Sequence, residues 1–267
     1  MDAVLPQELS PLIGRGVSVG SLPSSRGTLR MSPPLSVALP DGGFPQGGVV
    51  ELAAPGNLGQ GVSVALAACA ASQEQAHAKR GESAWCAFLD PDRTLHGPSV
   101  RASGVCLERL LVARPPRSVL ARVALKIALS HVFSVIVVDL DGVPGVPPEP
   151  ATLGAGLRTP SKVDWSRVAR RLSLAVENSI TTVFLLTDAH RPRPLGLPVA
   201  MRLELETVHF GDLSIRVAKE RRGRVRGPRS IAWTRPTSEQ RAQAVSVHEE
   251  AFVASASPCS VATLRRE

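Results

Sequence analysis

The sequence contains no tyrosine, and aromatic residues make up only 3% of its 267 residues. Proteins that hold single-stranded nucleic acid without sequence preference commonly stack the bases on aromatic side chains. A surface built for base stacking is therefore not expected in this chain. If the protein binds nucleic acid, we expect contacts with the phosphates that are independent of base sequence.

The patterns that hold metal ions or disulfide frameworks are missing as well. No C-x-x-C pair occurs among the four cysteines, which are Cys69, Cys86, Cys106 and Cys259. The six histidines are scattered, with no pair at metal-ligand spacing. Cys69 and Cys86 stand in apolar runs and are predicted to be buried thiols, which favours a reducing compartment. We therefore expect no bound metal and a cytoplasmic protein.

Signatures of membrane proteins and of common hydrolases are also absent from the sequence. No apolar stretch reaches the roughly 18 residues that a membrane span requires. The N-terminus, MDAVLPQELS, has no basic segment followed by a long apolar one. There is no G-x-S-x-G motif and no pairing of cysteine with histidine that indicates a catalytic nucleophile. We expect no contact with a membrane.

What the chain has in excess is arginine. Of its 31 basic residues 27 are arginines, and the formal net charge is +8. The arginine fork matches the geometry of phosphates, so an anionic partner is expected, although a GC-rich genome produces the same bias. The hydrophobic content of 43% and the length fit one large folded domain with appendages.

The chain is expected to consist of three parts. Residues 1–34 are rich in glycine, serine and proline and are predicted to be a flexible arm with a short helix at 4–13. Residues 35–235 are predicted to form the folded core. Residues 236–267 lack sustained periodicity, which predicts a loosely ordered tail.

Within the core, apolar segments alternate with amphipathic ones. Near-continuous apolar segments predict buried parallel strands at 48–53, 84–90, 109–115, 133–141 and 181–188. Helical periodicity predicts helices that cover both faces of the sheet, at 62–79, 118–131 and 164–178. Later segments that alternate apolar with polar residues predict an antiparallel extension at 199–206, 213–220 and 229–233. The expected fold class is α/β, a mostly parallel sheet flanked by helices and extended by antiparallel strands.

The segment ELAAPGNLGQGVSVAL, residues 51–66, has the apolar strand, glycine-rich turn and apolar helix with which a phosphate-binding loop begins. A working loop, G-x-x-x-x-G-K-[ST], needs its lysine to neutralise phosphate oxygens and its hydroxyl to bind magnesium. In one register Gln60 replaces the lysine, and in the other Val62 replaces it while Ser63 keeps the hydroxyl. Both registers lack the lysine, so we predict a degenerate nucleotide loop, formed by Ala54, Pro55, Gly56, Asn57, Leu58, Gly59, Gln60 and Gly61. A plain strand-to-helix turn is the alternative interpretation.

The order and spacing of several segments resemble the core of RecA-type recombinases. The segment at 35–66 is similar to the one that opens that core. CAFLDPD, VIVVDLD and TTVFLLTD are similar to three of the strands that follow, at 86–92, 135–141 and 181–188. The resemblance covers about residues 35–235 and implies a RecA-like P-loop core.

The chain departs from that family at the residues that handle ATP. Asp92 stands where RecA-type proteins carry a catalytic glutamate, and Asp188 where they carry a γ-phosphate-sensing glutamine, whereas Asp139 keeps the acid of the Walker B strand. With the lysine also missing, the resemblance implies a protein that is not an enzyme and binds no cofactor.

A shortened RecA-like core with an altered nucleotide loop resembles the ImuA-type accessory proteins of bacterial translesion-synthesis cassettes. The resemblance implies a role in SOS-linked mutagenic DNA repair. It implies RecA, or the inactive Y-family polymerase homologue of such a cassette, as the protein partner.

Basic residues that could contact single-stranded DNA gather in two places. The segment at 216–229 carries seven cations against Glu220 alone, and these are Arg216, Lys219, Arg221, Arg222, Arg224, Arg226 and Arg229. A smaller group, Arg191 and Arg193, follows the strand at 181–188. We predict that these residues bind phosphates in a salt-dependent manner. A solvated charged turn is the alternative interpretation.

Two other functions stay open on the sequence alone. One is a weak DNA-dependent ATPase that uses Gln60, Asp92 and Asp139, against which the missing lysine argues. The other is a plain single-stranded-DNA-binding module, against which the scarcity of aromatic residues argues.

Overall fold

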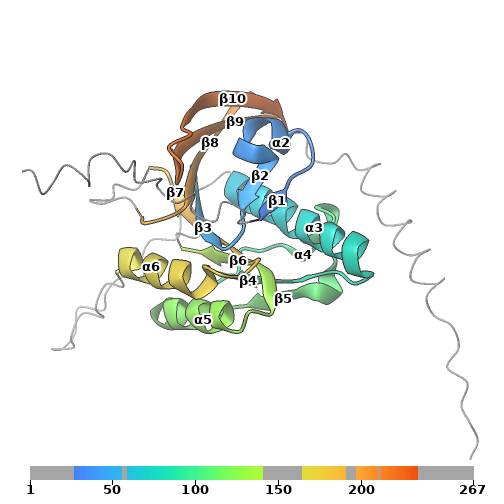
Figure 1. Ribbon diagram of the computed structural model, residues 1–267, viewed down its shortest axis with the longest axis vertical. Coiled ribbons are helices and arrows are strands. Elements are labelled where there is room, and N and C mark those ends of the chain that lie inside the picture. The colour runs from blue at the N-terminus through green and yellow to red at the C-terminus, as the bar shows by residue number, and fades with distance from the viewer. Residues whose placement is uncertain (1–26, 56–58, 141–163, 191–196, 210, 234–267) are drawn as a thin grey trace, which may run out of the picture.

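A mixed eight-stranded sheet forms the centre of the protein (Figure 1). The computed structural model describes residues 27–55, 59–140, 164–190, 197–209 and 211–233. Five strands run parallel in the order β3, β7, β6, β4 and β5, with bounds Gly48–Ala54, Thr182–Asp188, Phe133–Asp139, Trp85–Leu89 and Leu110–Ala113. On the other side of β3, β8 (Met201–His209) is parallel to β3, and β9 (Asp212–Glu220) and β10 (Arg226–Ala232) continue the sheet antiparallel.

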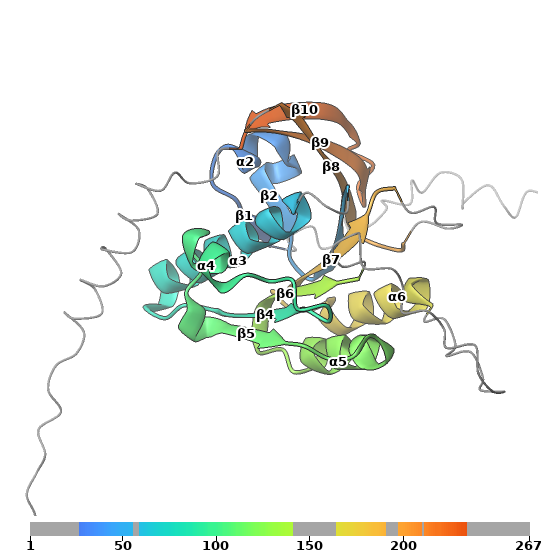
Figure 2. The ribbon, with the colours of Figure 1, turned by 180° about the vertical axis from the view of Figure 1, so that it is seen from behind.

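Helices cover both faces of the parallel part. α3 (Gln60–Arg80) lies on one face, and α5 (Arg117–Leu129) and α6 (Trp165–Val176) lie on the other, as two opposite views show (Figure 1, Figure 2). Alternate residues of β3 serve the two cores, since Val50 packs on the α3 side and Val49 on the α5–α6 side. All residues of β3 are buried for this reason, which explains the continuous apolar run of a central parallel strand. None of the helices in the described ranges has the length and apolarity needed to cross a membrane.

Short elements complete the face that carries α3. β1 (Thr28–Arg30) and β2 (Gly43–Pro45) pair antiparallel as a separate two-stranded ribbon, linked by α2 (Leu35–Ala38) and the 3-10 helix η2 (Pro40–Gly42). Phe44 of β2 is fully buried, and its ring meets that of Phe184 edge-on with centroids 4.9 Å apart. The ribbon therefore packs onto the sheet beside α3. Between β4 and β5 lie α4 (Gly97–Ala102) and the 3-10 helix η3 (Leu107–Arg109).

The ends of the helices follow from local chemistry. α3 begins after Gly59 and ends before Gly81, whose φ angles of 68° and 75° lie in the left-handed region. Glycine adopts that region without steric cost, so both residues allow sharp changes of chain direction. α6 is capped by Asp164, whose carboxylate accepts hydrogen bonds from the backbone N–H groups of Ser166 and Arg167 at 3.0 and 3.3 Å.

The predicted strands and helices of the core are confirmed, with two corrections. The predicted boundary at residue 35 is wrong, because β1 begins at Thr28 and Met31 is buried. β8 does not extend the sheet antiparallel as predicted; it is parallel to β3, and the antiparallel part begins with β9. An alternating pattern shows that one face of a strand is solvated, but it does not fix the direction of its neighbour. The predicted helix at 4–13 and the tail at 236–267 lie outside the described residues.

Candidate nucleotide turn and basic hairpin

The turn predicted to be a degenerate nucleotide loop joins the carboxyl end of β3 to the start of α3. Gly56, Asn57 and Leu58 lie outside the described residues, but both ends of the turn are described. Gly61, in the first turn of α3, faces the sheet, and a Cβ built on it would lie 3.7 Å from Leu186. The Ser63 hydroxyl donates to the Gly59 carbonyl at 3.0 Å. The hydroxyl that one register assigned to magnesium therefore hydrogen-bonds to the backbone of the helix.

Gln60 takes the place of the lysine if the loop begins at Ala54, and its side chain is hydrogen-bonded to the sheet. Its side-chain nitrogen donates to the Thr207 hydroxyl of β8, and the residue is only 8% exposed. Its Oε1 atom is buried and has no hydrogen-bond partner among the described residues. A neutral amide held in this way supplies none of the positive charge that a phosphate cradle needs.

Asp92, in the position of the catalytic glutamate, is held by an arginine. Arg117, the first residue of α5, donates from Nε to Asp92 Oδ1 at 3.0 Å and from Nη2 to Oδ2. Its Nη1 also donates to the Leu140 carbonyl, just beyond β6, at 2.6 Å. Each oxygen of Asp92 accepts one hydrogen bond from this guanidinium, so the carboxylate and Arg117 together join the segments after β4 and β6 to the start of α5.

Asp90, two residues earlier, is a structural residue that the sequence analysis did not single out. Its side chain is fully buried and accepts from the backbone N–H groups of Thr94 and Leu95 at 2.8 and 3.1 Å. Arg114 lies 3.6 Å from the same carboxylate. Buried carboxylates are stable when such partners surround them, so Asp90 fixes the loop that carries Asp92.

The strand order brings the other predicted acids to the same edge. Asp188 is paired in register with Ala54, and Asp139 with Leu186, so the ends of β3, β7 and β6 meet beside the turn. The Asp188 carboxylate accepts from the backbone N–H of His190 at 2.9 Å and so caps the chain that follows β7. The structure therefore brings Asp139 and Asp188 to the edge of the sheet at which the turn after β3 begins.

Metal-ligating side chains do not cluster in the part of the chain that the structure describes: no three of its His, Cys, Asp and Glu side chains could together hold an ion. Cys69 and Cys86 are fully buried, which confirms their prediction as buried thiols. A hydrogen bond with Cys86 and burial raise the pKa of the Cys69 thiol, so it stays protonated and unreactive.

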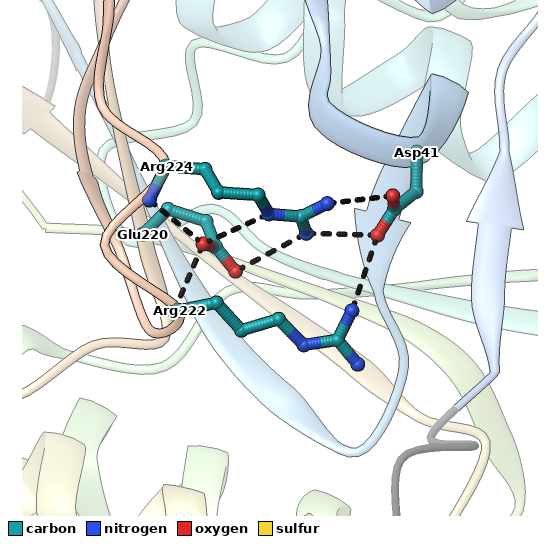
Figure 3. A network of polar contacts seen from close by, with 4 residues as sticks. All are labelled: Asp41, Glu220, Arg222 and Arg224. Carbon is teal, nitrogen blue, oxygen red and sulfur yellow. Dashed lines mark hydrogen bonds and ion pairs between the residues drawn. The ribbon is translucent and has the colours of Figure 1, made fainter.

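The basic segment at 216–229 forms a hairpin between β9 and β10, and much of its charge is paired. Arg224 donates from Nη1 and Nη2 to the two oxygens of Asp41 at 2.7 and 2.8 Å (Figure 3). It also donates from Nε to Glu220 Oε2 at 3.3 Å, and Arg222 lies 3.6 Å from Asp41. Arg216 pairs with Glu204 at 3.0 Å. The sequence segment has seven cations and one acid, but in the fold two further acids, Asp41 and Glu204, pair with its arginines. The hairpin is therefore less positively charged than the segment alone indicates.

The charges of this network reinforce one another. The hydrogen bond from Arg224 holds the pKa of Asp41 below its usual value, and the charges of Arg224, Arg222 and Arg226 lower it further. Burial raises the pKa of Glu220, but hydrogen bonds from Arg224 and Arg222 outweigh this, so that pKa is also lowered. Hydrogen bonds to Asp41 and Glu220 raise the pKa of Arg224. All these groups are charged at neutral pH.

The remaining residues predicted to contact DNA differ in whether their side chains already bind other groups of the protein. Lys219 donates from Nζ to the Leu197 carbonyl at 3.1 Å, and Arg229 donates to the Val37 carbonyl at 3.2 Å. Within the described ranges, Arg221 and Arg226 take part in no ion pair, and Arg221 is exposed. Arg191 and Arg193 lie outside the described residues. Among the described candidates, Arg221 and Arg226 are therefore the ones without a side-chain partner, and the DNA contacts predicted for the whole group stay a prediction.

Comparison with known proteins agrees with this architecture. Residues 22–186, more than half of the chain, match the RecA N-terminal domain family. Over 162 residues the chain is 32% identical to protein RecA of Oceanobacillus iheyensis, an alignment that covers 58% of this chain and 43% of that protein. The chain thus spans less than half the length of this relative, and the predicted RecA-like core is confirmed. Because the matched residues make up more than half of the chain and the order of the strands agrees, the chain belongs to the RecA N-terminal domain family.

Proposed function

We propose that the protein is a non-catalytic RecA-like accessory protein of SOS-linked translesion DNA synthesis that acts through contacts with other proteins. The main observation behind the proposal is that the Gln60 side chain is buried and hydrogen-bonded. A buried amide bound to Thr207 occupies the place of the phosphate-neutralising lysine. Phosphoryl transfer depends almost entirely on positioning and electrostatics, so losing this cation removes the main contribution of the loop.

The environment of Asp92 supports the same proposal independently. A RecA-type ATPase needs an acid that activates water, and here the acid at that position is bound on both oxygens by Arg117. Restoring a lysine alone would leave this pairing in place. Two separate parts of the catalytic apparatus are therefore altered, in a core whose fold is retained.

The partners that we propose are a RecA filament or the inactive Y-family polymerase homologue of a translesion cassette. The kinship to RecA supports a role in DNA repair, and the altered turn favours an accessory part over a recombinase. The proposed role places the protein in the cytoplasm with the replication and repair machinery. The finer assignment rests on the resemblance to ImuA-type proteins.

Nucleotide binding is the measurement that tests the proposal. A site occupied at a hundred times its dissociation constant stabilises the folded state by about 2.7 kcal/mol. In a protein of this size that corresponds to a rise in melting temperature of roughly 5–11 °C. We expect no rise with millimolar ATP and Mg²⁺ and no phosphate release with single-stranded DNA, with a RecA protein as the positive control. A rise of that size in the unaltered chain would overturn the proposal.

A weak DNA-dependent ATPase is the second candidate, because the ends of β3, β6 and β7 still meet as a nucleotide site requires. In that case ATP turnover must depend on Asp139 and rise when single-stranded DNA is added. An Asp139→Asn variant with unchanged turnover would assign any phosphate release to a contaminant.

Direct contact with single-stranded DNA is a third, smaller possibility, carried by Arg221 and Arg226 of the hairpin. Each phosphate contact removed should lower the log–log salt slope of binding by about 0.7. Changing both residues to glutamate is expected to lower it by about 1.4 in fluorescence anisotropy with an oligo-dT strand. Arg122→Glu with Arg170→Glu, on α5 and α6, is the control of equal charge change. Equal effects of the two double variants would indicate non-specific attraction.

A further inference from the structure

A cavity lies at the end of the sheet opposite to the nucleotide turn. It has a volume of about 380 Å³ and is lined at the first residues of β3 and β8, Gly48 and Met201. Its other walls come from the outer side of the β1–β2 ribbon, from Asp41 and from the hairpin at 220–224. Ligand pockets in proteins commonly measure about 300–1,000 Å³, so this one suits a few side chains or a small molecule.

The wall of the cavity combines closely packed glycines with apolar side chains. Four of the lining residues are glycines, and a Cβ built on each would lie between 2.0 and 3.2 Å from another atom of the protein, so the packing of the chain itself requires them: Gly27, Gly43, Gly47 and Gly48. Pro40, Pro45 and Ala200 supply apolar surface. A ligand that fits must therefore be partly apolar.

The charges at the cavity set the charge of its ligand. Three arginines and two carboxylates line it, so the formal charge of the wall is +1: Arg221, Arg222 and Arg224 against Asp41 and Glu220. Arg224 is committed to both carboxylates, and Arg222 lies beside Asp41. Arg221 is exposed, and the described residues place no ion pair on its guanidinium. The wall fits one negative charge and opposes several, because Asp41 and Glu220 repel any further anionic group.

The wall beside Arg224 is held in a fixed shape. Asp41 has a φ of 52°, a left-handed conformation that is uncommon outside glycine. Two hydrogen bonds from Arg224 keep its carboxylate in place (Figure 3). The same contacts tie the hairpin to the segment between α2 and β2. The backbone of Arg221 is held as well, since its N–H donates to the Ala200 carbonyl at 2.8 Å.

We propose that this cavity binds one carboxylate of a partner protein, a glutamate or aspartate side chain in a short, partly apolar segment, with Arg221 as its principal contact. A guanidinium binds a carboxylate through two parallel hydrogen bonds, which gives orientation as well as affinity. A nucleic-acid strand fits less well, since its successive phosphates would meet Asp41 and Glu220. The site is remote from the turn at 54–61, so the proposal holds whether or not that turn binds nucleotide.

The test uses the full chain and two capped tetrapeptides, Ala-Leu-Glu-Ala and its twin Ala-Leu-Gln-Ala. The twins differ only in the carboxylate. Binding is followed by NMR on the arginine Nε–Hε signals. We expect the glutamate peptide to shift the signal of Arg221 and to bind at least tenfold more tightly than its twin. Equal binding of the twins, or no binding of either, would overturn the proposal.

Variants locate the effect on the hairpin. Arg221→Ala is expected to lower the affinity for the glutamate peptide at least tenfold, whereas Arg226→Ala, in the same hairpin but outside the cavity wall, should change it less than twofold. Circular dichroism of both variants is the check that each keeps the fold. An oligo-dT strand that displaces the peptide and binds more tightly through the same Arg221 would assign the surface to nucleic acid and overturn the proposal.

Discussion

The two ends of the parallel sheet carry charge in different ways. At the carboxyl end, acidic side chains are used to hold the protein's own loops: Asp92 binds Arg117, Asp90 binds a turn, and Asp188 caps the segment after β7. At the amino end, arginines outnumber the carboxylates that line the cavity, and Arg221 at its rim takes part in no ion pair in the described structure. At the carboxyl end the acids Asp90, Asp92 and Asp188 bind the protein's own groups, whereas at the amino end Arg221 is exposed beside a cavity. We expect substitutions at the first to affect stability and those at the second to affect binding.

The largest effect is expected at Asp90. Asp90→Ala removes a buried carboxylate and leaves the N–H groups of Thr94 and Leu95 without their acceptor. Each buried group left unpaired costs about 1–3 kcal/mol, so we expect the free energy of unfolding to fall by about 3 kcal/mol in urea titrations. Asp90→Asn keeps an acceptor oxygen, so its free energy of unfolding should fall by less. If Asp90→Ala is as stable as the parent, the carboxyl end is not structural in the sense proposed.

A smaller effect is expected at Arg224. Arg224→Ala leaves Asp41 and Glu220 facing one another without the guanidinium between them. Because its side chain is 36% exposed, solvent screens these pairs, and we expect a loss of about 1 kcal/mol. Arg216→Ala is the matched control, since that side chain is 55% exposed and pairs with Glu204 alone. Equal losses in the two variants would show that the Arg224 network adds nothing beyond a surface ion pair.

The dependence of stability on pH tests the ion pairs at the amino end of the sheet. The pKa values of Asp41 and Glu220 are held below their ordinary values of 3.8 and 4.5. A lowered pKa in the folded state means that this stabilisation is complete above the unfolded values and is lost as pH falls through the folded ones. Between about pH 5 and pH 3, the parent should therefore lose more stability than Arg224→Ala, by under about 1 kcal/mol. Parallel pH curves for the two proteins would contradict the assignment.

Most of the sheet could be predicted from the sequence, because a strand buried on both faces must be apolar along its whole length. β3, β6 and β7 show this directly. The β1–β2 ribbon escaped prediction, since its strands have three residues each and β2 contains glycine and proline. Short segments of that kind carry too few positions to show a period of two.

The candidate sites were predictable only in part, because a side chain's position in a motif does not reveal its partner. The missing lysine and the place of Asp92 could be inferred from the sequence. The pairing of Asp92 with Arg117 spans 25 residues, and that of Asp41 with Arg224 spans 183. No local pattern connects residues so far apart. Only the fold shows that Asp92 pairs with Arg117 and that Asp41 neutralises part of the basic hairpin.

The smallest expected effect comes from rebuilding the nucleotide loop. Gln60→Lys with Gly61→Thr restores the cation and the hydroxyl, and a Cβ at residue 61 would meet Leu186 at 3.7 Å, an ordinary contact. The cradle still begins with Ala54 in place of glycine, so we expect ATP to bind weakly, with a dissociation constant on the order of 1 mM. At 1 mM ATP that adds only about 0.4 kcal/mol of stability, by mass action. Isothermal calorimetry with ATP and ADP measures the affinity directly.

Hydrolysis should not return in this rebuilt loop, since Arg117 still occupies both oxygens of Asp92. Adding Arg117→Met removes the guanidinium while keeping most of the side-chain length, and only this triple variant is expected to release phosphate above background. Turnover by the double variant with Arg117 in place would show that the pairing does not block catalysis. The carboxyl end would then differ from an active RecA-like site by its lysine alone, and the contrast between the two ends of the sheet would rest on Gln60.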